Sequence, residues 1–136
     1  MKNLILLFIF LSLSSCVSQV KKDSIQKYYF YFDRTQPNMK VYGKLHELRY
    51  LYEINNPHNY EPVIFIPKDS IVKEISVEKL KSYDLKDYKW LNTFSGLEID
   101  KFFFEDTPKK EYYLIEKRES NKFLYLRKVY FIQEID

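Results

Sequence analysis

The two histidines of the chain, His46 and His58, are the first residues to consider for chemistry, because imidazole both binds metal ions and transfers protons near neutral pH. His46 is followed by Glu47, as at the start of a zinc-protease helix, but that motif needs a second histidine four residues after the first. Tyr50 occupies that position. His58 lies among Pro and Asn residues, with no pair of acidic or cysteine ligands nearby in the sequence. We therefore predict no metal site and no cofactor, and we expect both histidines to be surface or turn residues.

The sequence also lacks a recognisable set of residues for nucleophilic or acid–base catalysis. Ser95 precedes Gly96, but the second flanking glycine of a nucleophile elbow is missing. The chain has only two glycines, so no glycine-rich phosphate-binding loop is present. Asp100, Glu105 and Asp106 are close in sequence, yet nothing singles out a catalytic pair among 19 acidic residues. The sequence therefore predicts a protein that is not an enzyme.

Aromatic residues offer a different kind of site, a stacking platform for a sugar or a peptide. The chain has 13 Tyr, 11 Phe and 1 Trp, and many of them alternate with polar residues. The candidate ligand-binding residues are Trp90, Tyr112, Tyr113, Tyr125 and Tyr130. The other interpretation is that these rings form the core and the sheet faces, since aromatic side chains bury large areas and favour strands. The sequence leaves both interpretations open.

The first 16 residues have the pattern of an export signal. Lys2 supplies a positive charge, and residues 4–11 form an apolar run that is about half the roughly 20 residues needed to span a bilayer. Leu13-Ser14-Ser15-Cys16 comes next, and it resembles the lipobox of bacterial lipoproteins. The resemblance implies a signal peptide over residues 1–15 and a lipid on Cys16, which would become the mature N-terminus. It also implies that this cysteine, the only one in the chain, is neither a nucleophile nor a disulfide partner.

The residues after Cys16 bear on location. Val17 is not the aspartate that resembles an inner-membrane retention signal, and no acidic run is present there that resembles a surface-export signal of the Bacteroidota. The richness in Lys, Ile, Asn, Tyr and Phe is similar to the amino-acid usage of AT-rich genomes of the Bacteroidota kind. We expect an outer-membrane lipoprotein that faces the periplasm, with residues 16–27 as its lipidated N-terminus and flexible tether.

The length and the charge of the chain beyond the tether indicate how many domains it has and which partners it lacks. Residues 28–136 are enough for one domain with its own core. After removal of Lys2 with the signal, 21 basic residues stand against 19 acidic ones, which is a net charge of +2 with both signs interspersed. A nucleic-acid-binding protein shows clustered basic stripes instead, so we predict no nucleic-acid partner.

The apolar pattern predicts strands first, helices in the middle and strands at the end. Residues 39–55 fit two strands with a bulge near His46, or a helix; we prefer strands because Gly43 disfavours a helix interior. The other expected elements are a central strand at 28–32, a strand at 63–66, helices at 77–83 and 85–91, a strand at 97–104, and a hairpin of 111–118 with 122–135. Together they predict an α+β domain with a mainly antiparallel sheet, a short helical segment in the middle and a C-terminal β-hairpin.

These observations favour a lipid-anchored envelope protein that acts as a non-enzymatic protein-interaction module. It would be an accessory protein or an immunity-type protein that blocks an incoming toxin. The alternative is a glycan- or small-ligand-binding lipoprotein that uses exposed aromatic residues. The partners expected are the membrane, through the N-terminal lipid, and another envelope protein.

Overall fold

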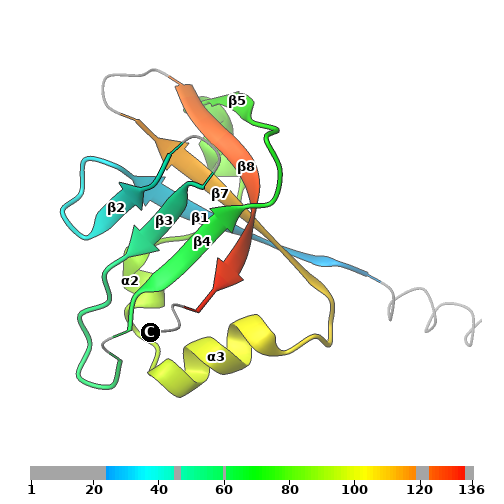
Figure 1. The fold of residues 1–136 in the computed structure, drawn as a ribbon. Helices are drawn as coiled ribbons and strands as arrows, with labels where there is room; N and C mark the ends of the chain where they lie inside the picture. The colour runs from blue at the N-terminus through cyan, green and yellow to red at the C-terminus, as the bar shows by residue number, and fades with distance from the viewer. Residues whose placement is uncertain (1–23, 45–46, 60, 119–122, 134–136) are drawn as a thin grey trace, which may run out of the picture.

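One eight-stranded sheet makes up most of the structure, and it curls into a half-barrel (Figure 1). The computed structural model describes residues 24–44, 47–59, 61–118 and 123–133. The helical elements are the 3₁₀ helix η1 (Glu78–Ser82) and the helices α2 (Tyr88–Leu91) and α3 (Gly96–Phe104). The strands are β1 (Gln26–Asp33), β2 (Met39–Tyr42), β3 (Arg49–Tyr52), β4 (Val63–Pro67), β5 (Lys73–Ser76), β6 (Leu85–Lys86), β7 (Lys110–Lys117) and β8 (Phe123–Ile132).

The sheet is mixed, because its first strand pairs in parallel on both sides. The strand order is β2-β3-β4-β8-β7-β1-β6, and β5 pairs with β8 outside this path. β1 runs parallel to β7 over its whole length and parallel to β6 on its other side. The prediction of an α+β domain with a mainly antiparallel sheet is therefore wrong. The fold is mostly β. In a sheet with only antiparallel pairs, residues 26–33 would not run parallel to residues 110–117, as they do here.

The two C-terminal strands belong to the middle of the sheet. β7 and β8 pair antiparallel, with Tyr112 opposite Val129 and Lys117 opposite Leu124. On its other side, β8 pairs with β5 through its first half and with β4 through its second half. The predicted C-terminal hairpin is thus not a separate unit, because both of its strands have further neighbours in the sheet.

An aromatic core fills the concave side of the half-barrel. Phe30 and Phe32 of β1, Tyr50 and Tyr52 of β3 and Phe65 of β4 have no exposed surface. They form one cluster with Ile99 and Phe103 of α3, which lies across one end of the half-barrel (Figure 1). A smaller cluster of Ile75, Ile115 and Leu124 lies on the other side of the sheet, next to η1. Because aromatic side chains bury large areas, this cluster contributes strongly to the stability of the fold.

Residues 97–104 form a helix where the apolar pattern predicts a strand. The side-chain oxygen of Ser95 accepts a hydrogen bond of 3.2 Å from the backbone nitrogen of Glu98, which caps the N-terminus of α3. Ile99 and Phe103 then lie four residues apart on the buried face of the helix. The strand prediction is wrong because the local cap and this helical spacing outweigh the high strand propensity of the phenylalanines.

The other middle elements differ from prediction mainly in extent. Residues 39–55 do contain two strands, but β2 and β3 reverse direction around Gly43, whose φ is +93°, instead of continuing through a bulge. The helix predicted at 77–83 is the 3₁₀ helix η1. The helix predicted at 85–91 shrinks to α2, which Asp87 caps through the backbone nitrogen of Trp90.

The N-terminal predictions lie mostly outside the described residues. The signal peptide at 1–15, Cys16 and most of the tether belong to this group. β1 begins at Gln26, two residues before the predicted start of the domain. Within the described residues, no helix has both the length and the apolar character that crossing a bilayer requires.

Candidate functional site: an arginine-lined cavity

A cavity of about 920 Å³ opens at the end of the half-barrel where β7 and β4 finish and β3 begins. Its basic lining residues are Arg49, Lys68, Arg118 and Arg127, and its acidic ones are Glu47 and Asp69. Apolar side chains, among them Leu48, Ile66 and Val72, complete the wall. A neighbouring cavity of about 660 Å³ shares Arg118 and includes Arg34. The volume of the larger cavity is in the range that accommodates a small ligand or a few residues of a partner.

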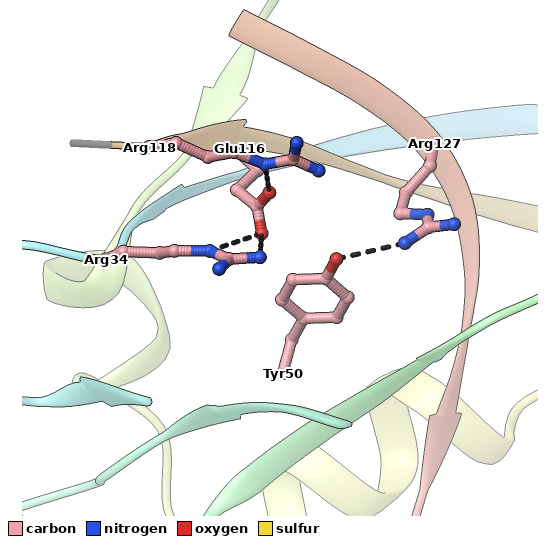
Figure 2. A network of polar contacts seen from close by, with 5 residues as sticks. All are labelled: Arg34, Tyr50, Glu116, Arg118 and Arg127. Carbon is pink, nitrogen blue, oxygen red and sulfur yellow. Dashed lines mark hydrogen bonds and ion pairs between the residues drawn. The ribbon is translucent and has the colours of Figure 1, made fainter. Parts of the chain in front are cut away.

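A buried carboxylate holds two of the arginines in place. Glu116 is 1% exposed, and its oxygen Oε2 accepts hydrogen bonds from Nε and Nη2 of Arg34, at 3.0 and 2.9 Å. Its other oxygen, Oε1, accepts a hydrogen bond of 2.5 Å from Nε of Arg118 (Figure 2). Both oxygens are therefore occupied, and the two guanidinium groups are fixed by one charge.

The strand register explains why these three residues meet. Tyr112 and Leu114 of β7 pack toward the aromatic core, and Glu116 continues the same row because alternate residues of a strand share a face. Asp33 pairs with Lys117 at the ends of the parallel strands β1 and β7. The next residues, Arg34 and Arg118, therefore leave the sheet side by side.

Arg127 approaches the same region from β8. Its atom Nη1 donates a 3.0 Å hydrogen bond to the hydroxyl of Tyr50, a residue without exposed surface (Figure 2). Its atom Nε is buried and has no hydrogen-bond partner among the described residues. A buried N–H without a partner costs about 1–3 kcal/mol, so this donor lowers the stability of the fold.

The predicted aromatic site residues divide between the two faces of the sheet. Trp90 and Tyr112 pack against the core cluster, and burial raises the pKa of Tyr112 to about 12. Tyr113 stacks on Tyr29, with ring centroids 5.2 Å apart, on the opposite face.

Tyr125 and Tyr130 of β8 lie close to basic residues. The Tyr125 ring lies 4.0 Å from the guanidinium carbon of Arg118, which is cation–π geometry. Tyr130 is 47% exposed, with Nζ of Lys68 5.3 Å from its ring. The structure therefore does not gather the five candidates on one platform, although Tyr125 adjoins a lining residue of the cavity.

The residues considered for metal binding and catalysis lie elsewhere. The backbone oxygen of His58, in the loop between β3 and β4, accepts a hydrogen bond from the backbone nitrogen of Gly96, the first residue of α3, whereas His46 lies outside the described residues. Asp100 is hydrogen bonded to Gln133 at the far end of the half-barrel. In the part of the chain that the structure describes, no three His, Cys, Asp or Glu side chains converge as a ligand set would.

Sequence reasoning missed all four charged residues of the polar network around the cavity, Arg34, Glu116, Arg118 and Arg127. A signal was present, since Glu116 interrupts the apolar row of Tyr112 and Leu114 on the inward face of a strand. A carboxylate there needs a basic partner, because an unpaired buried charge is strongly destabilising. The identity of that partner depends on the β1–β7 register, which the sequence does not reveal.

Comparison of the chain with protein-family models, with curated proteins and with solved structures gives no match.

Proposed function

We propose that this chain is a lipid-anchored bacterial envelope protein that acts as a non-enzymatic interaction module and holds a partner protein at the Arg118–Arg127 cavity. The observation that carries the proposal is the lining of that cavity, where four basic residues stand against two acidic ones. A lining of this kind suits the binding of an acidic group.

The residues that dominate the cavity support binding more than proton transfer. Arginine stays protonated at any physiological pH and has no acceptor, so it does not act as a general base. Fixed arginines next to aromatic and apolar side chains are typical of the energetically important centre of protein interfaces. Arg118 has this setting, between the carboxylate of Glu116 and the ring of Tyr125.

The anchor rests on the resemblance of residues 13–16 to a lipobox. Two or more acyl chains give stable membrane attachment, at about 0.8 kcal/mol for each buried CH₂. A Cys16→Ser variant is expected to lose the acylated mass and to leave the membrane pellet. A variant that kept both would contradict the lipoprotein part of the proposal.

The interaction part is tested by site-specific photo-cross-linking in intact cells. A photoreactive residue at Val72, which lines the cavity and is 38% exposed, is expected to give one dominant cross-linked envelope protein or toxin. The matched control is Leu97 on α3, which is 80% exposed at the opposite end of the half-barrel. Equal cross-linking patterns from the two positions, or none from Val72, would overturn the proposed docking site.

A further inference from the structure

The free edge of β2 lies beside the smaller of the two cavities. β2 is at one edge of the half-barrel, where it pairs with β3 on one side and has no strand partner on the other among the described residues (Figure 1). The cavity of about 660 Å³ is lined by all four residues of β2, Met39–Tyr42, together with Arg34 and Arg118. Since alternate residues of a strand point to opposite faces of the sheet, a cavity that touches all four runs along the strand edge.

The backbone of Val41 points toward this edge. The backbone nitrogen of Glu53 donates to the backbone oxygen of Asn38, and this bond sets the pattern between β2 and β3. In an antiparallel pair the bonds come from alternate residues, so the N–H and C=O groups of Met39 and Val41 point away from β3. The Met39 N–H is used by the preceding turn, whereas the Val41 groups have no partner in the described part of the chain. Unpaired edge groups of this kind are a template for a further strand.

Arg34 brings unused donors to the same cavity. Its Nε and Nη2 each donate to the carboxylate of Glu116, and Nη1 has no partner among the described residues. Because a guanidinium group has five N–H donors, the edge formed by Nη1 and Nη2 retains two parallel N–H groups. The Arg34 side chain is 35% exposed and that of Glu116 only 1% exposed, so the edge turned away from Glu116 is the one open to another molecule.

The charges around Arg34 favour a carboxylate at that edge. Arg118 donates to the other oxygen of Glu116, so two positive charges share one negative charge. The described lining of the cavity has three basic residues and no acidic one, although one of the three, Lys40, pairs with Glu53 outside it. Glu116 fixes the guanidinium of Arg34, so little side-chain freedom is lost on binding. A carboxylate accepts two parallel hydrogen bonds from such an edge.

We infer that an extended segment of the partner protein adds a strand to the free edge of β2, and that an acidic side chain of this segment binds the Nη edge of Arg34. The inference rests on the proposed function, because it names the form and the charge of the partner segment. Arg118 lines both cavities, so one partner reaches from the Arg118–Arg127 cavity to this edge without a gap. β2 has only four residues and offers few main-chain bonds, so the ion pair with Arg34 supplies much of the affinity.

The test measures hydrogen exchange of the Val41 amide by ¹⁵N NMR in the full chain with its native lipid, held in phosphatidylcholine nanodiscs. The probe is the blocked peptide acetyl-Thr-Val-Glu-Val-Thr-amide, which places β-branched residues around one acid. At roughly 10 mM, a probe with a Kd of about 1 mM occupies about nine tenths of the protein. Exchange at Val41 is then expected to slow by about tenfold, because only the free protein exchanges.

Two control peptides separate the charge from the strand pairing. Replacement of the glutamate by glutamine keeps the shape without the charge, and it is expected to weaken binding by about tenfold. N-methyl groups on the glutamate and on the valine after it remove a main-chain donor from each edge of the peptide. This second control is expected to leave the exchange of the Val41 amide unchanged.

Variants assign the charge effect to Arg34. Arg34→Met is expected to weaken binding of the glutamate probe by about tenfold and to leave binding of the glutamine probe unchanged. Lys44→Met removes a positive charge from an exposed residue two positions after β2, and it is expected to leave both affinities unchanged within about twofold. Arg34→Lys keeps a charge for Glu116 without the guanidinium edge. It replaces the Met variant if that protein fails to fold, with the same expected loss.

Four results would overturn the inference: slow exchange of Val41 without any peptide, equal binding of the glutamate and glutamine probes, undiminished slowing by the N-methylated peptide, or equal losses in the Arg34 and Lys44 variants. The first would mean that a second copy or another part of this chain already covers the edge. Any of the four together with cross-linking at Val72 would leave the proposed function intact. Selective slowing by the glutamate probe without a cross-linked protein at Val72 would support the edge site and contradict docking at the Arg118–Arg127 cavity.

Discussion

The hydrogen bond from Arg127 to Tyr50 joins β8 to β3 across the intervening strand β4, on the concave side of the half-barrel. Tyr50 is completely buried, so its hydroxyl reaches this bond at the boundary between the aromatic core and the cavity. The core therefore orients a residue of the candidate site directly.

Tyr50→Phe is expected to destabilise the fold by about 1–2 kcal/mol, because it removes an acceptor from a charged donor at a partly buried position. Urea unfolding followed by circular dichroism measures the change. The matched control is Tyr42→Phe on β2, whose ring is 47% exposed and whose hydroxyl loss should cost less than about 0.5 kcal/mol. Equal effects of the two changes would mean that the Arg127 bond contributes nothing to stability.

Glu116→Gln is expected to cost about 2 kcal/mol or more, since it leaves the guanidinium groups of Arg34 and Arg118 without their shared negative charge. Both arginines are about one third exposed, so water offsets part of the loss. The same substitution at Glu53, which pairs with Lys40 at the surface, should change stability far less, because water screens an exposed ion pair. The free energy of unfolding of the two variants separates a structural ion pair from a surface one.

Asp33 makes stability depend on pH in the acid range. Burial alone raises the pKa of Asp33, but hydrogen bonds from Thr35 and the charge of Lys117 outweigh it, so the net pKa lies below the ordinary 3.8. The folded state then binds the proton less tightly than the unfolded state. The contribution of Asp33 is present above the unfolded pKa and is lost as the pH falls through the folded pKa.

An Asp33→Asn variant should therefore be less stable than the wild type near neutral pH, and the difference should shrink below about pH 4. Urea unfolding at a series of pH values measures it. A difference that stayed constant down to the acid transition would show that the carboxylate charge of Asp33 does not stabilise the fold.

The contribution of Tyr112 to stability is lost at alkaline pH and not at acid pH. Burial, with smaller contributions from Tyr28 and Asp106, raises the pKa of Tyr112 from 10.0 to about 12. Its contribution to stability is complete below pH 10 and is lost as the pH rises toward 12. Between pH 10 and 12, the stability of a Tyr112→Phe variant should fall less steeply with pH than that of the wild type. Thermal unfolding of both proteins at a series of pH values measures the difference. Parallel curves would contradict the raised pKa.

Ser95→Ala tests the cap that sets the start of α3. Loss of the bond to the Glu98 nitrogen should cost about 1 kcal/mol, the usual effect of removing an N-cap hydroxyl. Ser70→Ala, in the exposed loop after β4, is the matched change without a cap. Thermal unfolding of both variants gives the comparison, and equal melting temperatures would mean that Ser95 does not hold the helix.

That cap also shows what could be predicted from the sequence. Ser95 and Glu98 have the spacing of a capping box, and the cap of α2 is Asp87, three residues after the aspartate that the same spacing favours as a cap. The strand prediction for 97–104 put more weight on aromatic strand propensity than on this local signal. Strand positions with clear alternation, such as those of β7 and β8, were predicted well because period two is a local property.

The parallel pairing of β1 with β7 was not predictable in the same way. It joins residues more than 80 positions apart, and neither strand differs locally from one that pairs antiparallel. The candidate cavity depends on that pairing, since it places Arg34 beside Glu116 and Arg118. The aromatic core was foreseeable from composition, whereas the arginine network required the three-dimensional register.

The direction of β1 places the start of the domain and the cavity at opposite ends of the strand. The described chain enters the sheet at Gln26, whose backbone nitrogen donates to the backbone oxygen of Lys109, and β1 carries it to Asp33 at the cavity end. Eight extended residues span roughly 26 Å at about 3.3 Å each. A lipid attached upstream of Gln26 would therefore pull on the pole of the domain opposite to the arginines. The anchor and the cavity would then lie at opposite poles of the domain.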